Sequence, residues 1–212
     1  PATHTALAQL QPSGQLQALA LQWQGGWDAP TDYQVTAQVH RLGLAPYSGA
    51  GFPGIGVAGM DADITATRSG GSAAWKMTKG VLALPTVLED SRVPVDEAAA
   101  TLRWAWQDGR LRLEMQRLQF ANADLAGELG VVWTGPRATT PAAPGLGELS
   151  LQGRLTRLQA ARLVRYLPTA MDRDVRNYLR DAFSGGELGP VSFKLKGDMD
   201  QFPFSNGRPG TF

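Results

Sequence analysis

Residues 32–39, DYQVTAQV, carry the clearest structural signal in the chain. Polar side chains alternate there with apolar ones, which are Tyr33, Val35, Ala37 and Val39. Successive side chains of a β-strand point to opposite faces of its sheet. This period of two therefore predicts a strand with one apolar face and one polar face.

The same alternation recurs along most of the chain. It groups the apolar residues Leu19, Leu21 and Trp23; Met60, Ala62 and Ile64; Trp75 and Met77; Leu102, Trp104 and Trp106; Leu111, Leu113 and Met115; Leu125, Leu129, Val131 and Trp133; Leu149, Leu151 and Leu155; and Val191, Phe193 and Leu195. Turn-forming residues, such as Gly25-Gly26 and Asp108-Gly109, separate these groups. The sequence therefore predicts a mainly β fold with many short antiparallel strands.

Two segments show a helical period instead. In residues 159–167, apolar side chains recur at helical spacing until a proline, which cannot continue a helix. In residues 171–183, Asp172 and Asp174 fall in the first turn, where acidic side chains are favoured, and glycines follow the end. These signals predict a helical hairpin near residues 159–184. Its apolar stripe is expected to pack on the sheet through Leu163, Val164, Leu167, Val175, Leu179 and Phe183.

The proline content divides the chain into three parts. Residues 136–147 form a Pro-rich loop, because their composition favours neither strand nor helix. Residues 1–135 are expected to form an antiparallel β segment, and residues 148–212 a β segment that contains the helical hairpin.

The composition excludes several classes of function. Lys and Arg number 20 and Asp and Glu 19, so no overall field attracts nucleic acid. The absence of cysteine excludes disulfides and thiolate metal sites. No apolar run approaches the roughly 18 residues that a membrane-spanning helix needs. The start of the chain has neither an initiator Met nor a signal peptide, so we expect a soluble piece of a longer protein.

Catalytic patterns are weak. His40 has no G-x-S-x-G motif elsewhere in the sequence to supply a nucleophile. Residues 49–54, GAGFPG, have the spacing of a dinucleotide-binding loop, but strand-like residues follow where that loop needs a helix. Asp198 and Asp200 lack a third acidic residue or a histidine nearby in sequence. The chain is therefore expected to be no enzyme and to use no cofactor or metal.

Two enriched residue types allow more than one interpretation. Arginines crowd residues 154–180, which favours a solvated helix face over contact with lipid head groups or an acidic partner. The chain has six tryptophans, which would suit sugar binding. However, Trp104 and Trp106 alternate with polar neighbours, and this favours a role in the core.

An ordered set of short motifs occupies the last fifty residues. They are Arg165-Tyr166-Leu167-Pro168, Tyr178-Leu179, Ala182-Phe183, Gly185-Gly186, Lys196-Gly197-Asp198 and Phe202-Pro203-Phe204. The set resembles the signature of the YhdP branch of the AsmA-like superfamily, which consists of large bacterial envelope proteins. The resemblance covers nearly the whole chain. It implies a long β-sheet that is strongly curved into an open groove or half-barrel, of which this chain would be one continuous fragment.

The resemblance also implies a function in lipid transfer. The groove would conduct phospholipids between the inner and outer membranes of a Gram-negative bacterium, and this chain would be a periplasmic part of a protein anchored in the inner membrane. The implied partners are phospholipid acyl chains, the remaining segments of the same long chain, and proteins of the two membranes. No nucleic acid is expected among them.

Lipid contact is expected from the apolar face of the strands. The candidate residues are Leu102, Trp104, Leu111, Leu113, Met115, Val191, Phe193 and Leu195. The alternative is a structural or interaction module of the cell envelope, in which a β-sandwich seals its apolar faces and conducts no lipid. An open apolar groove would distinguish the first arrangement from the second.

Overall fold

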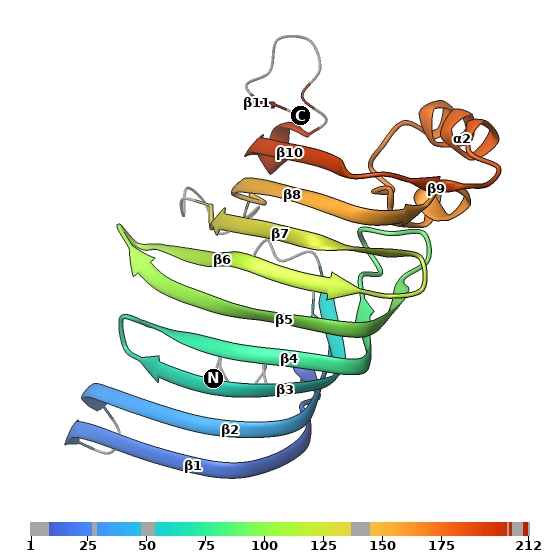
Figure 1. The fold of residues 1–212 in the computed structure, drawn as a ribbon. Helices are drawn as coiled ribbons and strands as arrows, with labels where there is room; N and C mark the ends of the chain where they lie inside the picture. The colour runs from blue at the N-terminus through green and yellow to red at the C-terminus, as the bar shows by residue number, and fades with distance from the viewer. Residues whose placement is uncertain are drawn as a thin grey trace.

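The alternating segments form strands of one antiparallel sheet in the computed structural model of the chain, which describes residues 9–26, 29–47, 54–136, 145–202, 204 and 210–211. The first eight strands follow each other in the sheet: β1 (Ser13–Gly26), β2 (Ala29–Tyr47), β3 (Ile55–Thr67), β4 (Gly70–Ala83), β5 (Arg92–Gln107), β6 (Arg110–Ala121), β7 (Leu125–Thr134) and β8 (Glu148–Gln159). Next to β8 lie β10 (Val191–Asp198) and then β11 (Gly210–Thr211), while the short β9 (Glu187–Leu188) also pairs with β8. Figure 1 shows these strands stacked in order from β1 to β10.

The predicted mainly β antiparallel fold is confirmed. Strands β1 to β8 are 10 to 19 residues long, so they are longer than the short strands expected. They reach this length because they continue across register shifts, where an extra residue bends a strand without ending it. The sheet is open, since its pairing path starts at β1 and ends at β11. Of the Pro-rich loop, residues 137–144 lie outside the described residues, yet β7 and β8 pair directly on its two sides.

The helical hairpin forms with shorter bounds than expected. Its first member is a 3-10 helix, η1 (Ala160–Tyr166), and its second is α2 (Arg173–Ala182); a third short helix, η2 (Met199–Gln201), follows β10. The Asp172 carboxylate caps α2 by accepting hydrogen bonds from the backbone N–H groups of Asp174 and Val175. Among the helices of the described residues, none combines the length and the hydropathy that a membrane crossing requires.

A line of left-handed residues bends the first four strands. Gly14, Arg41, Gly59 and Lys79 have φ angles of 123°, 52°, 84° and 53° and lie on β1, β2, β3 and β4. Register shifts accompany three of them, because the pairing changes between Ser13 and Gln15, between Val39 and Leu42, and between Ala58 and Met60. In Figure 1, the right-hand ends of these strands turn sharply upward.

Polar side chains lie next to the bend at Arg41. The Asp61 carboxylate accepts a hydrogen bond of 3.0 Å from the backbone N–H of Arg41 and lies 2.6 Å from Nδ1 of His40. The hydrogen bond from Arg41 is the main reason why the pKa of Asp61 is lower than usual. The hydrogen bond to Asp61 thus stabilises the backbone at the position where Arg41 adopts the left-handed conformation.

Candidate functional site: an apolar face and a polar clasp

Apolar side chains cover one face of the sheet from strand to strand. Paired residues of antiparallel neighbours point to the same face, so the register defines rows across the sheet. One row consists of Leu21, Val35, Ala66, Gly71, Trp104, Leu113, Trp133, Leu149 and Gly197. The next row on this face consists of Leu19, Ala37, Ile64, Ala73, Leu102, Met115, Val131, Leu151 and Leu195. We call this face, which runs from β1 to β10, the inner face.

The opposite face is polar. The row between the two just described consists of Ala20, Thr36, Thr65, Ser72, Arg103, Glu114, Val132, Ser150 and Lys196. We call it the outer face. An open hollow of about 470 Å³ lies on it between β4 and β8, and its lining includes the small residues Ala99 and Ala121 and the charged residues Lys76 and Glu128. The sheet is therefore amphipathic across its whole width.

The apolar face lies on the inside of the bend. Ala62 and Met77 belong to it and are only 5% and 4% exposed, although all strands of the described ranges belong to a single sheet. In a single layer, side chains become buried where the strands curve toward each other, which is the inner side of a bend. Gly80 permits this crowding, because a Cβ there would come within 2.3 Å of the sulfur of Met77.

The rest of the inner face is half-exposed. Leu19 and Leu21 on β1 are exposed, and Leu102, Leu113 and Leu195 are neither buried nor fully exposed. The expected core role is wrong for Trp106, which is 58% exposed, while Trp104 is half-buried. Within the described residues no second sheet covers this face, so the structure has the open groove and lacks the sealed sandwich.

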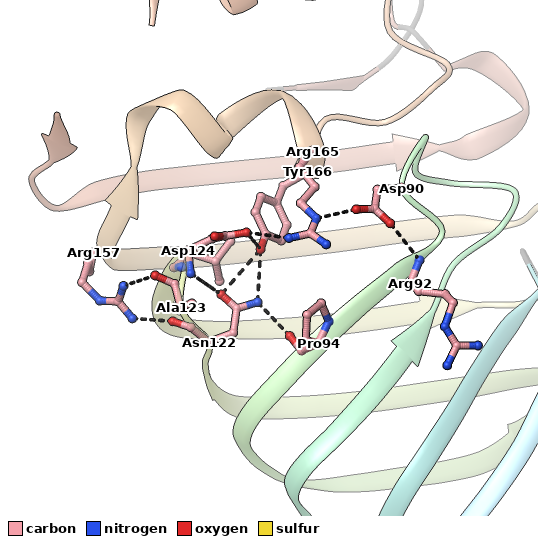
Figure 2. A network of polar contacts seen from close by, with 10 residues as sticks. Asp90, Arg92, Pro94, Asn122, Ala123, Asp124, Arg157, Arg165 and Tyr166 are labelled. Carbon is pink, nitrogen blue, oxygen red and sulfur yellow. Dashed lines mark hydrogen bonds and ion pairs between the residues drawn. The ribbon is translucent and has the colours of Figure 1, made fainter. Parts of the chain in front are cut away.

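A polar cluster ties the helices to one end of the strands. It consists of Asp90, Asn122, Asp124, Arg165 and Tyr166, which we call the clasp (Figure 2). The Tyr166 hydroxyl donates to Asp124 at 2.8 Å, and Arg165 donates to Asp124 at 2.9 Å and to Asp90 at 2.7 Å. The clasp thus joins η1 to the β4–β5 loop and to the β6–β7 turn.

Asn122 organises the centre of the clasp. It is only 6% exposed, and its amide donates to the Pro94 carbonyl at 2.9 Å and to the Tyr166 hydroxyl at 3.1 Å. Its side-chain oxygen accepts from the backbone N–H groups of Asp124 and Leu125, both at 2.9 Å. Such an Asn turn satisfies backbone donors that would otherwise be buried without partners.

The electrostatics of the clasp follow from its partial burial. The pKa of Tyr166 is raised to about 12, mainly by burial and also by the hydrogen bond to Asp124. The hydrogen bond to Asp124 also raises the pKa of the Arg165 guanidinium above its ordinary value, and the nearby charge of Asp90 adds to this. Around neutral pH, Tyr166 is therefore a neutral donor beside an ion pair.

A small closed core lies next to the clasp. Leu88, Val93, Leu125, Leu158 and Ala160 are buried there, where β5, β7, β8 and η1 meet the β4–β5 loop. Leu88 also forms a backbone bridge with Pro168, and the Thr169 N–H donates to the Val87 carbonyl at 2.8 Å. In Figure 1, the loop between β4 and β5 rises to this same end of the sheet.

A family model described as "YhdP protein" matches residues 1–212, the full length of the chain. The chain belongs to the YhdP family. This is a family of bacterial envelope proteins, as the motifs between residues 165 and 204 indicated. No curated protein and no solved structure gave a significant match to the chain.

All the predicted lipid-contact residues of this YhdP chain lie on the inner face. Leu102, Trp104, Leu111, Leu113 and Met115 are paired across β5 and β6, and Val191, Phe193 and Leu195 face the same side on β10. The register brings these two groups to one continuous surface through β7 and β8. Whether they contact lipid is still a prediction.

The residues predicted for hairpin packing are distributed differently. Leu163, Val164 and Leu167 are half-buried in and after η1, and Leu179 and Phe183 are half-buried at α2. However, α2 lies against η1, and it is η1 that contacts β8. Val175 is 46% exposed, and no residue of α2 is buried. These contacts place α2 against η1 and η1 against β8, while the packing of the individual stripe residues on the sheet stays a prediction.

The clasp was missing from the sequence interpretation. Asn122 and Asp124 stood out only as a turn signal, and Arg165 and Tyr166 only as part of a family motif. Their sequence separations of 41 to 75 residues leave no local pattern that links them. Within the described residues, no three His, Cys, Asp or Glu side chains gather so that they could hold a metal ion. The dinucleotide-like motif lies almost entirely outside the described residues.

Proposed function

We propose that this chain is a segment of a bridge-like lipid-transfer protein, whose inner face carries the acyl chains of phospholipids between the two membranes of the cell envelope. The observation that supports it best is the continuity of the apolar rows from β1 to β10 on the inside of an open, bent sheet. In this proposal the chain is the periplasmic part of a protein anchored in the inner membrane. It performs no chemistry.

The energetics favour an acyl chain on the inner face. Each CH₂ group removed from water contributes about 0.8 kcal/mol, so an acyl chain is far more stable against half-exposed leucines than in the periplasm. The rows through Leu113 and Leu151 continue without a charged residue from strand to strand. A lipid can therefore move from one strand to the next without breaking a strong polar contact, because neighbouring positions are chemically alike.

Site-specific crosslinking tests this function. A photoreactive amino acid is placed at Leu113 or Phe193 on the inner face, and at the matched outer-face neighbours Glu114 or Lys194. After incubation of the 212-residue chain with phospholipid vesicles, irradiation should attach phospholipid at the two inner positions and little at the two outer ones. Equal lipid attachment on both faces, or none on the inner face, would contradict the proposal.

The same experiment addresses the structural alternative. If the inner face is an assembly surface without lipid, the probes at Leu113 and Phe193 should attach to protein only. Mass spectrometry of the crosslinked products distinguishes a lipid adduct from a peptide adduct by its mass. A protein-only result would favour an interaction module of the envelope over lipid conduction.

A further inference from the structure

The inner face has two margins, one at each end of its strands. One margin is covered by other parts of the chain, and the other is open. All the buried apolar residues of the described ranges lie toward one margin: Ala62, Met77, Leu88, Val93, Leu125, Leu158 and Ala160. The bend closes this margin on β3 and β4, and η1 with the β4–β5 loop closes it on β7 and β8. An apolar group at this margin is shielded from water by these contacts.

The opposite margin is open and aromatic. Here lie the β1–β2, β3–β4 and β5–β6 hairpin ends, and the outermost rows of the inner face contain Trp23, Tyr33, Trp104, Trp106 and Trp133. We call this set the aromatic margin. Among the described tryptophans, Trp75 alone lies deeper, four residues along β4 and thus two inner-face rows inward from the row of Trp104. Tryptophan and tyrosine favour places where an apolar environment meets water, because their rings are apolar and carry a polar group.

The cationic side chain of Arg68 lies at the aromatic margin. Arg68 follows the last residue of β3, and the pairing of Gln34 with Thr67 puts it across from Tyr33. Its guanidinium donates to the Thr31 carbonyl at 2.7 Å, and within the described residues it has no carboxylate partner. The nearby Asp32 carboxylate accepts from the backbone N–H of Tyr33 at 2.8 Å. Arg68 therefore retains donors for an anion.

The neighbouring surface has a shape that suits an amphiphile. An open hollow of about 470 Å³ lies between β1 and β2 at this margin. Its lining residues are Leu21, Trp23 and Tyr33, which belong to the inner-face rows, and Gln22, Gln24, Asp32 and Gln34, which belong to the outer-face rows. Apolar and polar residues of β1 and β2 thus border one hollow, and one of them, Tyr33, lies across from Arg68.

We propose that the aromatic margin is a headgroup subsite: Arg68 contacts the phosphate of a phospholipid whose glycerol region lies against Tyr33 and Trp104 and whose acyl chains point toward Ala62 and Met77. This inference rests on the proposed function and adds an orientation to it. The change from charge through aromatic rings to aliphatic side chains follows the change of polarity along a phospholipid. A sugar or a peptide has no long apolar tail to match the deep rows.

Two phospholipid probes test the orientation. One carries a diazirine on its headgroup and the other carries it at the end of an acyl chain, and each is photolysed with the 212-residue chain before peptide mapping. The headgroup probe should label residues around Tyr33, Arg68 and Trp104. The acyl-chain probe should label residues around Ala62 and Met77.

The outcomes separate the two proposals. Acyl-chain labels on the inner face together with headgroup labels at the bend or at η1 would overturn the orientation and leave lipid binding intact. The absence of labels from the inner face with both probes would overturn lipid binding itself. Headgroup labels spread evenly over both faces would also contradict the subsite.

A charge variant gives a second readout. Arg68→Gln should weaken capture of a phospholipid about two- to fivefold, as expected for an exposed ion pair, and leave capture of diacylglycerol unchanged. The matched control is Arg154→Gln, which removes an exposed cation from the outer face. Equal losses in the two variants, or a loss with diacylglycerol as well, would contradict a phosphate contact at Arg68. Because Arg68 is exposed, its replacement should leave the melting temperature unchanged, and this is measured first.

Discussion

The Tyr166 hydroxyl donates a hydrogen bond of 2.8 Å to the Asp124 carboxylate, and so ties η1 to the turn between β6 and β7. The two residues are 42 positions apart in the sequence. Through this contact and the neighbouring bonds of Arg165, one end of an otherwise open sheet becomes a closed unit. The stability of this end should therefore depend on a few polar side chains.

Removal of the Tyr166 hydroxyl should destabilise the protein. Tyr166→Phe loses the bond to Asp124 and leaves the Asn122 amide with one acceptor fewer, so the free energy of unfolding should fall by about 1 to 3 kcal/mol. Urea denaturation measures this change. Tyr178→Phe is the matched control, since Tyr178 is 71% exposed on α2, and equal effects of the two variants would rule out the clasp as the cause.

Replacement of Asn122 should cost more. Asn122→Ala leaves the backbone donors of Asp124 and Leu125 without their acceptor in a buried turn, and the expected loss is about 2 to 4 kcal/mol. Thermal melting measures it, with Asn177→Ala on α2 as the control. If Asn122→Ala lost less stability than Asn177→Ala, water would have to replace the Asn122 oxygen as the acceptor of these two N–H groups.

Alkaline pH should weaken the fold through Tyr166. Its pKa is about 12 in the folded protein and 10.0 for the ordinary side chain, so the unfolded chain loses its proton first as the pH rises. The contribution of this residue is therefore complete below pH 10 and disappears between pH 10 and about pH 12. Urea unfolding at several pH values in this range should show that the free energy of unfolding falls more steeply for the parent than for Tyr166→Phe. Parallel curves for the two proteins would contradict the raised pKa.

The bend should not tolerate a side chain at Gly80. A Cβ there would lie 2.3 Å from the sulfur of Met77 and 2.6 Å from the Ala58 carbonyl oxygen, so Gly80→Ala should lower the free energy of unfolding by about 1 to 3 kcal/mol. Gly185→Ala is the control, since nothing lies within 4 Å of a Cβ added at that position. Equal stability of the two variants in urea would show that the bend can relax.

The N-cap of α2 should act locally. Asp172→Ala removes the acceptor for two N–H groups and should destabilise the helix by about 0.5 to 2 kcal/mol. Since α2 buries no residue, the global melting temperature should change little, while amide exchange in α2 should accelerate. A large drop in melting temperature would instead mean that α2 supports the sheet.

The sequence by itself determined the amphipathic character of the strands. Alternation such as that of residues 32–39 is a local property, because each side chain needs only its two neighbours to fix which face it takes. The two helical segments after β8 could also be predicted, with errors of a few residues at their ends. An acidic cap and a following glycine are local signals too. The strand faces, and with them the eight predicted lipid-contact residues, therefore fell on one side of the sheet.

Only the tertiary structure decided how those faces are arranged in space. The bend depends on left-handed conformations at Arg41 and Lys79, residue types that give no sequence signal for them, and on register shifts between neighbouring strands. The clasp joins Asp90 to Arg165 across 75 residues, and no local pattern specifies such a pair. Local periodicity fixes the orientation of each side chain along its strand, whereas curvature and closure arise from contacts between residues far apart in the chain.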